Sequence, residues 1–222
     1  MSSPDTLRKT FLLGSIILGV LIVFGLVWAV SSGPSAAVAR SFNDQNDPAK
    51  GAESDKIVRI FGDIQCPACR SAEAGVKYAM QKYGDKVRFI WNDFPLQSIH
   101  PNALPAANAA RCAEAQGKFW EMHDKLYEEQ PTWEALPNPS QKFADFANAV
   151  GLNVDTFKTC IDKREHQSLI MDDLREGERN GVNGTPTFFF GDLLVSGILT
   201  NAEWDQRIQV MLATPAATPS TP

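Results

Sequence analysis

The sequence predicts an α/β fold that is interrupted in its middle by a helical insertion and preceded by an N-terminal transmembrane helix. Four observations predict this arrangement. The residues before about 100 alternate between strand-like and helical patterns, those from about 100 to 180 show only helical periodicity, and those after 180 return to short strands and a last helix. Ahead of them, Phe11–Val30 is an uncharged apolar stretch of 20 residues, long enough to span a bilayer.

The N-terminal apolar stretch sets the expected location of the chain. Arg8 and Lys9 precede it, so the positive-inside rule keeps residues 1–10 in the cytoplasm and places the remainder outside. A signal peptide cleaved near Ala39 is the alternative, because Ala37-Val38-Ala39 fits an A-x-A processing site. The stretch is longer than the roughly 7–15 apolar residues of a signal core, so we favour a retained single-pass anchor over a secreted or periplasmic protein. Both interpretations make the domain extracytoplasmic.

The composition predicts one folded domain behind this anchor. Hydrophobic residues make up 44% of the chain, charged residues 21%, and the net charge is −5, which excludes a disordered protein and a nucleic-acid-binding surface. We expect residues 31–54 to form a polar linker, residues 55–213 the domain, and residues 214–222 a disordered tail. The domain's roughly 160 residues are enough for one well-buried core.

The pattern of the first part of the domain predicts a strand, a helix and a second strand. Lys56–Ile64 is a strand-like apolar run, Pro67–Lys82 is an amphipathic helical pattern, and Val87–Trp91 is a second buried strand. Gly84 is a natural stop for the helix. A unit of this length implies that the two strands pair in parallel with a right-handed crossover.

The insertion, from about residue 100 to 180, shows three apolar stripes at helical spacing. The stripes are Cys112, Ala115, Phe119, Met122 and Leu126; Phe143, Phe146, Ala147 and Val150; and Val154, Phe157, Cys160 and Ile161. His123 lies one position off a stripe and is interpreted as a satisfied packing residue. The charged run from Asp172 to Arg179 is interpreted as a solvated helix face.

The pattern of the last part of the domain predicts two strands followed by a helix. Thr187–Phe190 and Leu193–Val195 are short apolar strands, and Gly191-Asp192 between them suits a two-residue hairpin turn. Thr200 with Glu203 forms a capping-box pattern ahead of the apolar face of a final helix. The hairpin is therefore expected to complete the sheet.

The motif Cys66-Pro67-Ala68-Cys69 lies directly between the first strand and the first helix. Unpaired backbone N–H groups and the positive end of the helix dipole stabilise a thiolate at this position. We expect Cys66 near the open end of the helix as the attacking thiol, Cys69 turned inward as the resolving thiol, and Pro67 at the first helical position. The motif therefore predicts thiol–disulfide exchange, in which Cys69 breaks a mixed disulfide formed at Cys66.

Other interpretations of the cysteines remain open. A zinc site needs a second paired spacing that the remaining cysteines and histidines do not offer, and covalent haem attachment needs histidine where the chain has Arg70. We expect no metal, but an inert disulfide at Cys66 and Cys69 is an alternative. Cys112 and Cys160 are expected to form a structural disulfide, with buried free thiols or a redox relay as alternatives.

Four segments resemble one known family. They are Ile64 to Cys69; Asp93 to Leu96 with His100 to Ala103; Arg111 to Ala113 with Gln116 to Trp120 and His123-Asp124; and Gly181 to Phe188. On these residues the chain resembles the DsbA-like family of thioredoxin-fold disulfide oxidoreductases, as a membrane-anchored or exported member, over about residues 52–213. The resemblance implies a thioredoxin fold with an inserted helical subdomain, no bound cofactor, exported cysteine-containing proteins as substrates, and a membrane quinone-linked thiol oxidase as redox partner.

The resemblance also implies roles for residues outside the cysteine motif. It implies that Pro186 is cis and faces the active site, beside the loop residues Pro67 and Ala68. Thr185 would then offer its N–H and C=O to an extended substrate, a form of β-strand addition. A turn without function is the alternative for Gly184-Thr185-Pro186.

The chain departs from the family pattern at two positions. Ile60 stands where the family carries a buried acid, so a proton acceptor for Cys69 is missing or comes from elsewhere, with Asp63 and water as candidates. Ala68 stands where the stronger oxidants carry histidine, so we expect a milder oxidant.

These observations predict an extracytoplasmic enzyme that introduces disulfides into exported proteins. A reductase or isomerase, including one for cytochrome maturation, would use the same residues with electrons moving the other way. A membrane-tethered binding or chaperone module with an inert disulfide is a further alternative.

Overall fold

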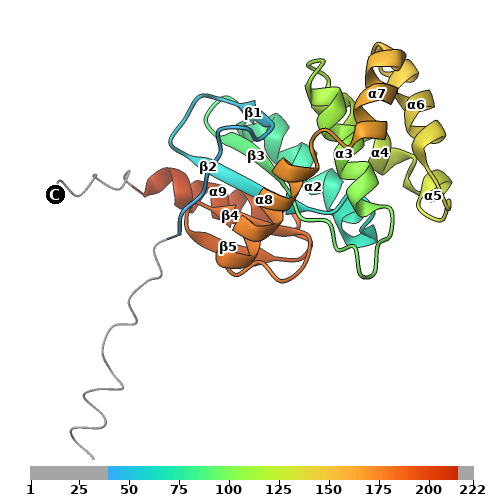
Figure 1. The fold of residues 1–222 in the computed structure, drawn as a ribbon. Helices are drawn as coiled ribbons and strands as arrows, with labels where there is room; N and C mark the ends of the chain where they lie inside the picture. The colour runs from blue at the N-terminus through green and yellow to red at the C-terminus, as the bar shows by residue number, and fades with distance from the viewer. Residues whose placement is uncertain (1–39, 215–222) are drawn as a thin grey trace, which may run out of the picture. The chain divides into compact units, whose positions relative to one another are not determined.

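The computed structural model describes residues 40–214, and a five-stranded mixed sheet lies at their centre (Figure 1). The strand order is β1-β3-β2-β4-β5. The strands are β1 (Ala49–Gly51), β2 (Ile57–Gly62), β3 (Arg88–Asp93), β4 (Thr187–Phe190) and β5 (Leu193–Ser196). As predicted, β2 and β3 pair in parallel, and β4 and β5 form an antiparallel hairpin that extends the sheet from β2.

The two faces of the sheet carry separate apolar cores. Ile60 pairs with Trp91 on one side and Phe188 on the other, and all three belong to the larger core, which α2 (Pro67–Tyr83) and α9 (Asn201–Ala213) cover. Phe61, the next residue of β2, belongs to a smaller core under α8 (Gln167–Arg179). This alternation is the period of two that a strand buried on both faces requires.

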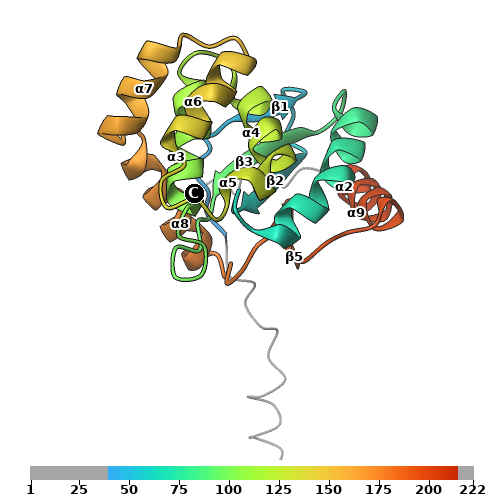
Figure 2. The ribbon, with the colours of Figure 1, turned by 90° about the vertical axis from the view of Figure 1, so that its right-hand side faces the viewer.

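The insertion folds into helices that lie beside the sheet. The helices are α3 (Ala103–Glu114), α4 (Phe119–Glu128), α5 (Gln130–Trp133), α6 (Ser140–Ala149) and α7 (Val154–Lys163), followed by α8. Figure 2 shows α6 and α7 next to α3, on the side of the domain away from α9. The predicted stripe from Cys112 to Leu126 is divided between α3 and α4, because Gly117 adopts a positive φ of 73° that ends the helical path.

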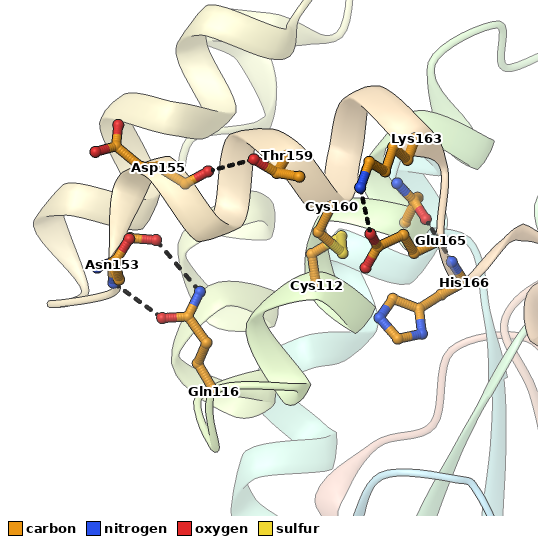
Figure 3. Close-up of a disulfide and its surroundings, with 10 residues drawn as sticks. Cys112, Gln116, Asn153, Asp155, Thr159, Cys160, Lys163, Glu165 and His166 are labelled. Carbon is orange, nitrogen blue, oxygen red and sulfur yellow. Dashed lines mark hydrogen bonds and ion pairs between the residues drawn. A yellow bond between two sulfur atoms is a disulfide. The ribbon is translucent and has the colours of Figure 1, made fainter.

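Cys112 in α3 and Cys160 in α7 are joined by a disulfide (Figure 3). Their Cα atoms are 5.9 Å apart, and both side chains are buried. Gln116 strengthens the same junction, because its side chain exchanges hydrogen bonds with the backbone of Asn153 at 2.9 and 3.3 Å. The bridge therefore joins two helices of the subdomain across 48 positions of the chain.

The folded domain begins earlier than expected. We expected residues 31–54 to form a linker, but residues 40–54 lie against the domain and include β1, which pairs antiparallel with β3. The Phe42 ring packs on Phe189, with centroids 4.9 Å apart, and Arg59 stacks over Phe42 while pairing with Asp44. The segment contains few apolar residues, and its order comes from contacts with distant partners rather than from a local pattern.

The charged run in α8 also differs from its interpretation as a solvated face. Asp173 and Glu176 are buried, and Asp173 accepts a hydrogen bond from the guanidinium of Arg111 at 2.6 Å. Arg111 is fully buried and also contacts Asp93 at 2.6 Å and Asp47 at 3.1 Å. A buried ion cluster therefore ties α3, α8, β3 and the N-terminal segment together.

The predicted membrane anchor lies outside the described residues, as do residues 1–10, the possible cleavage site near Ala39 and most of the C-terminal tail. Within residues 40–214, none of the helices has the length and apolar character needed to cross a bilayer.

Candidate active site

The two motif cysteines lie at the start of α2. Cys66 is the residue that precedes the helix, Pro67 occupies the first turn, and Cys69 follows within it. Both cysteines are free thiols, with exposed fractions of 6% for Cys66 and 3% for Cys69. The first turn contains no acidic side chain that would oppose a thiolate. The sequence predicted an open position for Cys66, but only a small part of this residue contacts solvent.

The loop that leads into Cys66 is held by the helical subdomain. Tyr127 donates its hydroxyl to the carbonyl of Asp63 at 3.1 Å, and Gln130 donates its side-chain amide to the carbonyl of Ile64 at 2.8 Å. Gln65 accepts a hydrogen bond from the backbone of Asn102 at 2.6 Å. The insertion thus holds the loop that positions Cys66, in addition to enlarging the fold.

Asp63 is the centre of this loop. One of its carboxylate oxygens accepts from the backbone N–H of Gln65 at 2.8 Å. The other accepts from the backbone N–H of Leu96 at 2.9 Å and lies 2.7 Å from Nδ1 of His100. Because both oxygens are already engaged in holding the loop, Asp63 is poorly placed as the proton acceptor that the sequence suggested for Cys69.

The two thiols differ in acidity. A hydrogen bond from the Cys69 thiol lowers the pKa of Cys66 to about 5, against the opposing effect of burial, with backbone N–H groups of Cys69 and Ala68 and a contact to Thr185 contributing. Burial, reinforced by the neighbouring Cys66, raises the pKa of Cys69 well above its ordinary value. Cys66 is therefore the thiolate at neutral pH, and Cys69 keeps its proton.

The loop before β4 faces the cysteines. The Thr185–Pro186 peptide bond is cis, and the carbonyl oxygen of Thr185 lies 3.6 Å from Sγ of Cys66. Thr187 fixes the loop by donating its hydroxyl to the carbonyl of Gly184 at 2.7 Å. The structure thus brings Cys66, Cys69, Thr185 and Pro186 together, although 116 positions separate Cys69 from Thr185 in the chain.

A small cavity behind Cys69 is lined by an acidic residue that the sequence did not single out. Cys69, Glu73, Tyr127 and Pro186 are among the residues that line it. Ile60, which stands at the position of the family's acid, lines it as well. Glu73 is buried, and burial raises the pKa of its carboxyl, with His123 opposing the shift. The spacing of four residues from Cys69 along a helix was the available signal, since such residues share a face.

Two groups of side chains in the described residues bring metal-ligating atoms close together. In the first, Cys112 and Cys160 lie near His166, but their sulfurs are joined to each other and are not thiolate ligands (Figure 3). In the second, Glu73, His123 and Asp124 offer atoms within 4.8 Å of one another. The carboxylates contact different nitrogens of His123, which places the ring between them.

Comparisons with known proteins place these features in context. A family model described as Thioredoxin matches residues 43–210. Among solved structures, a thioredoxin-like oxidoreductase from Silicibacter pomeroyi DSS-3 superposes with a TM-score of 0.66 at 26% identity, covering 78% of this chain and 96% of that one. BdbD from Bacillus subtilis, in its oxidised form, superposes with a TM-score of 0.69 at 24% identity, covering 80% and 99%.

The curated relatives are longer proteins. The Na(+)/H(+) antiporter NhaA 1 of Mycolicibacterium vanbaalenii is 32% identical over 171 residues, which is 75% of this chain and 26% of that protein. The NhaA 3 antiporter of Salinispora tropica is 36% identical over 137 residues, covering 62% of this chain and 20% of the relative. The chain thus spans about a quarter of the length of the curated relatives that it matches.

Proposed function

This chain belongs to the thioredoxin family, and from that premise we propose that it is an extracytoplasmic thiol–disulfide oxidoreductase that introduces disulfides into exported proteins. One arrangement carries the proposal: Cys66 lies at the start of α2, beside the buried thiol of Cys69 and 3.6 Å from the carbonyl oxygen of Thr185. In this position the pKa of Cys66 is lowered to about 5, while that of Cys69 is raised. An inert structural disulfide has no need of this difference in acidity.

The reaction cycle follows from these acidities. In the oxidised enzyme, a substrate thiolate attacks Cys66, the Cys66–Cys69 bond breaks, and Cys69 leaves and takes up a proton. A second substrate thiolate then attacks its own cysteine in the mixed disulfide and displaces Cys66 as a thiolate. The substrate has gained a disulfide and lost two electrons, which the enzyme's two thiols now hold. The low pKa of Cys66 favours this second step, because a more acidic thiol is a better leaving group.

Substrate binding is assigned to the loop before β4. Thr185 presents its backbone beside Cys66, where an extended substrate chain can pair with it as an added strand. Pro186 has no N–H to compete for that pairing. Recognition through backbone groups is tolerant of sequence, which suits an enzyme that acts on many exported proteins.

The N-terminal stretch and the partner complete the proposal. We propose that Phe11–Val30 anchors the enzyme in the membrane with its domain outside the cytoplasm, or that cleavage near Ala39 releases it. A membrane quinone-linked thiol oxidase would remove the two electrons after each cycle, with no cofactor bound to this chain. We propose no ion transport, since the match covers only a quarter of the antiporter relatives.

The test is the reduction potential of the Cys66–Cys69 pair, measured by equilibrating the purified protein with glutathione buffers. A potential above about −180 mV, the value of an isomerase, and towards the roughly −120 mV of strong oxidants would support oxidation of substrates. A potential near about −270 mV, that of cytosolic thioredoxin, would overturn the assignment in favour of a reductase. A disulfide that resists mild dithiothreitol would instead indicate a binding module.

A further inference from the structure

The buried Cys69 needs a route for its proton. Cys69 leaves as a thiolate in the proposed oxidation and must be protonated; in the reverse direction it must lose that proton before it can attack the mixed disulfide at Cys66. Its exposed fraction is 3%, so bulk water does not reach it freely. This question rests on the proposed function, because only exchange at Cys66 requires Cys69 to gain and lose a proton.

The cavity behind Cys69 offers the first part of such a route. It has a volume of about 10 Å³, close to what the centre of a single water molecule needs. Cys69 and Glu73 both line it from the same face of α2, one helical turn apart. The sheet contributes only uncharged side chains, among them Ile60, Trp91 and Phe188. Among the residues that line this cavity, Glu73 is therefore the only carboxylic acid.

His123 extends the route beyond Glu73. Its Nε2 lies 4.0 Å from the Glu73 carboxylate, is buried, and has no hydrogen-bond partner. A small rotation of the Glu73 side chain, or a bridging water, would close this gap. The imidazole is enclosed by aromatic rings, with the Trp91 centroid at 4.5 Å and the Tyr127 centroid at 4.9 Å, so its orientation is fixed.

The route ends at the surface of α4. Nδ1 of His123 lies 3.2 Å from the carboxylate of Asp124, whose side chain is 44% exposed. Lys77 of α2 pairs with the same carboxylate at 3.2 Å. The charged and titratable groups around Glu73 are thus Cys69 and Lys77 on its own helix, and His123, Asp124 and Tyr127 on α4. A histidine that contacts a buried acid through one nitrogen and a partly exposed acid through the other can relay a proton between them.

We propose that Glu73 and His123 form a proton path between Cys69 and solvent. When a substrate thiolate attacks Cys66, the bond to Cys69 breaks and the Glu73 carboxyl gives its proton to the Cys69 thiolate. His123 then returns a proton to Glu73 and takes one up at Nδ1 beside Asp124. In the reverse reaction the Glu73 carboxylate accepts the Cys69 proton, the thiolate attacks Cys66, and the bound thiol leaves. The raised pKa of Glu73 brings its titration closer to neutral pH, where a proton carrier is most effective.

The test uses the full chain with a peptide held on Cys66 as a mixed disulfide, and measures the rate of peptide release as a function of pH. In the unaltered protein we expect the rate to show an inflection at the pKa of Glu73. Glu73→Gln is expected to remove that inflection and to slow release by about 100-fold, in the range of general acid–base effects. Glu73→Asp restores part of both. Glu128→Gln, on the same helix as His123 and with a side chain that is 71% exposed, is the matched control and is expected to change neither.

A second variant keeps the test decisive if Glu73→Gln does not fold. His123→Gln is expected to slow release and to shift the inflection, because the proton on Glu73 is then replaced more slowly. Release from Glu73→Gln and His123→Gln at the original rate and with the original pH profile would overturn the proton path, as would an equal loss in Glu128→Gln. Alkylation of Cys66 is followed in parallel. An unreactive Cys66 in the unaltered protein would overturn the proposed function itself, whereas a reactive Cys66 with unchanged release would overturn only the path.

Discussion

Replacing Cys69 by alanine tests the origin of the acidity at Cys66. The hydrogen bond from the Cys69 thiol is the largest contribution to the low pKa of Cys66, which is about 5. A hydrogen bond to a charged group contributes about 1.5–3 kcal/mol, and 1.36 kcal/mol corresponds to one pKa unit, so the substitution should raise the pKa by roughly 1–2 units. In Cys69→Ala we therefore expect Cys66 to titrate with a midpoint at roughly pH 6–7, because the backbone N–H groups still lower its pKa.

The assay is the rate of iodoacetamide alkylation as a function of pH, with the Cys112–Cys160 disulfide left intact. In Cys69→Ala the reagent reports on Cys66 alone, the only remaining free thiol of the chain. Cys69→Ser is the matched control, because its hydroxyl can still donate and should keep the midpoint closer to that of the unaltered protein. The same midpoint in Cys69→Ala as in the unaltered protein, or an unaltered midpoint near 9, would refute the reasoning.

The same shift has a consequence for stability and reduction potential. Because folding lowers the pKa of Cys66 from 9.0 to about 5, the Cys66 thiolate stabilises the folded, reduced protein. This contribution of Cys66 is complete above pH 9 and is lost as the pH falls through about 5. At pH 7, two pKa units of this shift contribute, which corresponds to ~2.7 kcal/mol. At 30 mV for every 1.4 kcal/mol, this stabilisation raises the potential by ~60 mV relative to an ordinary thiol. Cysteines in the disulfide do not titrate, so between about pH 5 and pH 9 the stability difference between reduced and oxidised protein should follow this curve. Above pH 9 the raised pKa of Cys69 opposes it.

Three further predictions concern the neighbouring residue and the scaffold. Ala68→His should raise the reduction potential, measured in glutathione buffers, by tens of millivolts, because a cationic neighbour stabilises the Cys66 thiolate further; an unchanged potential would contradict this. Cys112→Ala/Cys160→Ala should lose about 4 kcal/mol of unfolding free energy in urea, from the 48-position separation of the bridge, while Cys66 alkylation stays unchanged. Loss of exchange in a folded double variant would instead indicate a relay. Arg111→Met should lose about 3–5 kcal/mol, because it leaves Asp93 and Asp173 buried without their cation, whereas Lys118→Met on the surface should lose less than about 1 kcal/mol.

The order of elements was predictable because it depends on local periodicity. Short continuous apolar runs predicted β2, β3 and β4, and Thr200 with Glu203 predicted the start of α9, where both hydrogen bonds of the capping box are present. The position of the cysteine motif was equally predictable, since a thiol at the start of a helix is defined by a few adjacent residues. The pairing of β2 with β3 followed from the length of the connection alone.

The buried charges were decided only by the tertiary structure. Glu73, Asp173 and Arg111 look like surface residues in the sequence, because a charged side chain is stable in the interior only when distant parts of the chain supply its partners. The same holds for residues 40–54, whose strand forms only when the edge of β3 is present to pair with it. The sequence by itself singled out Cys66 as the more acidic thiol, because that property depends on its place at the start of a helix. The three-dimensional arrangement decided which groups hold that thiol in place and which acid stands behind its partner, since those contacts join residues that no local pattern connects.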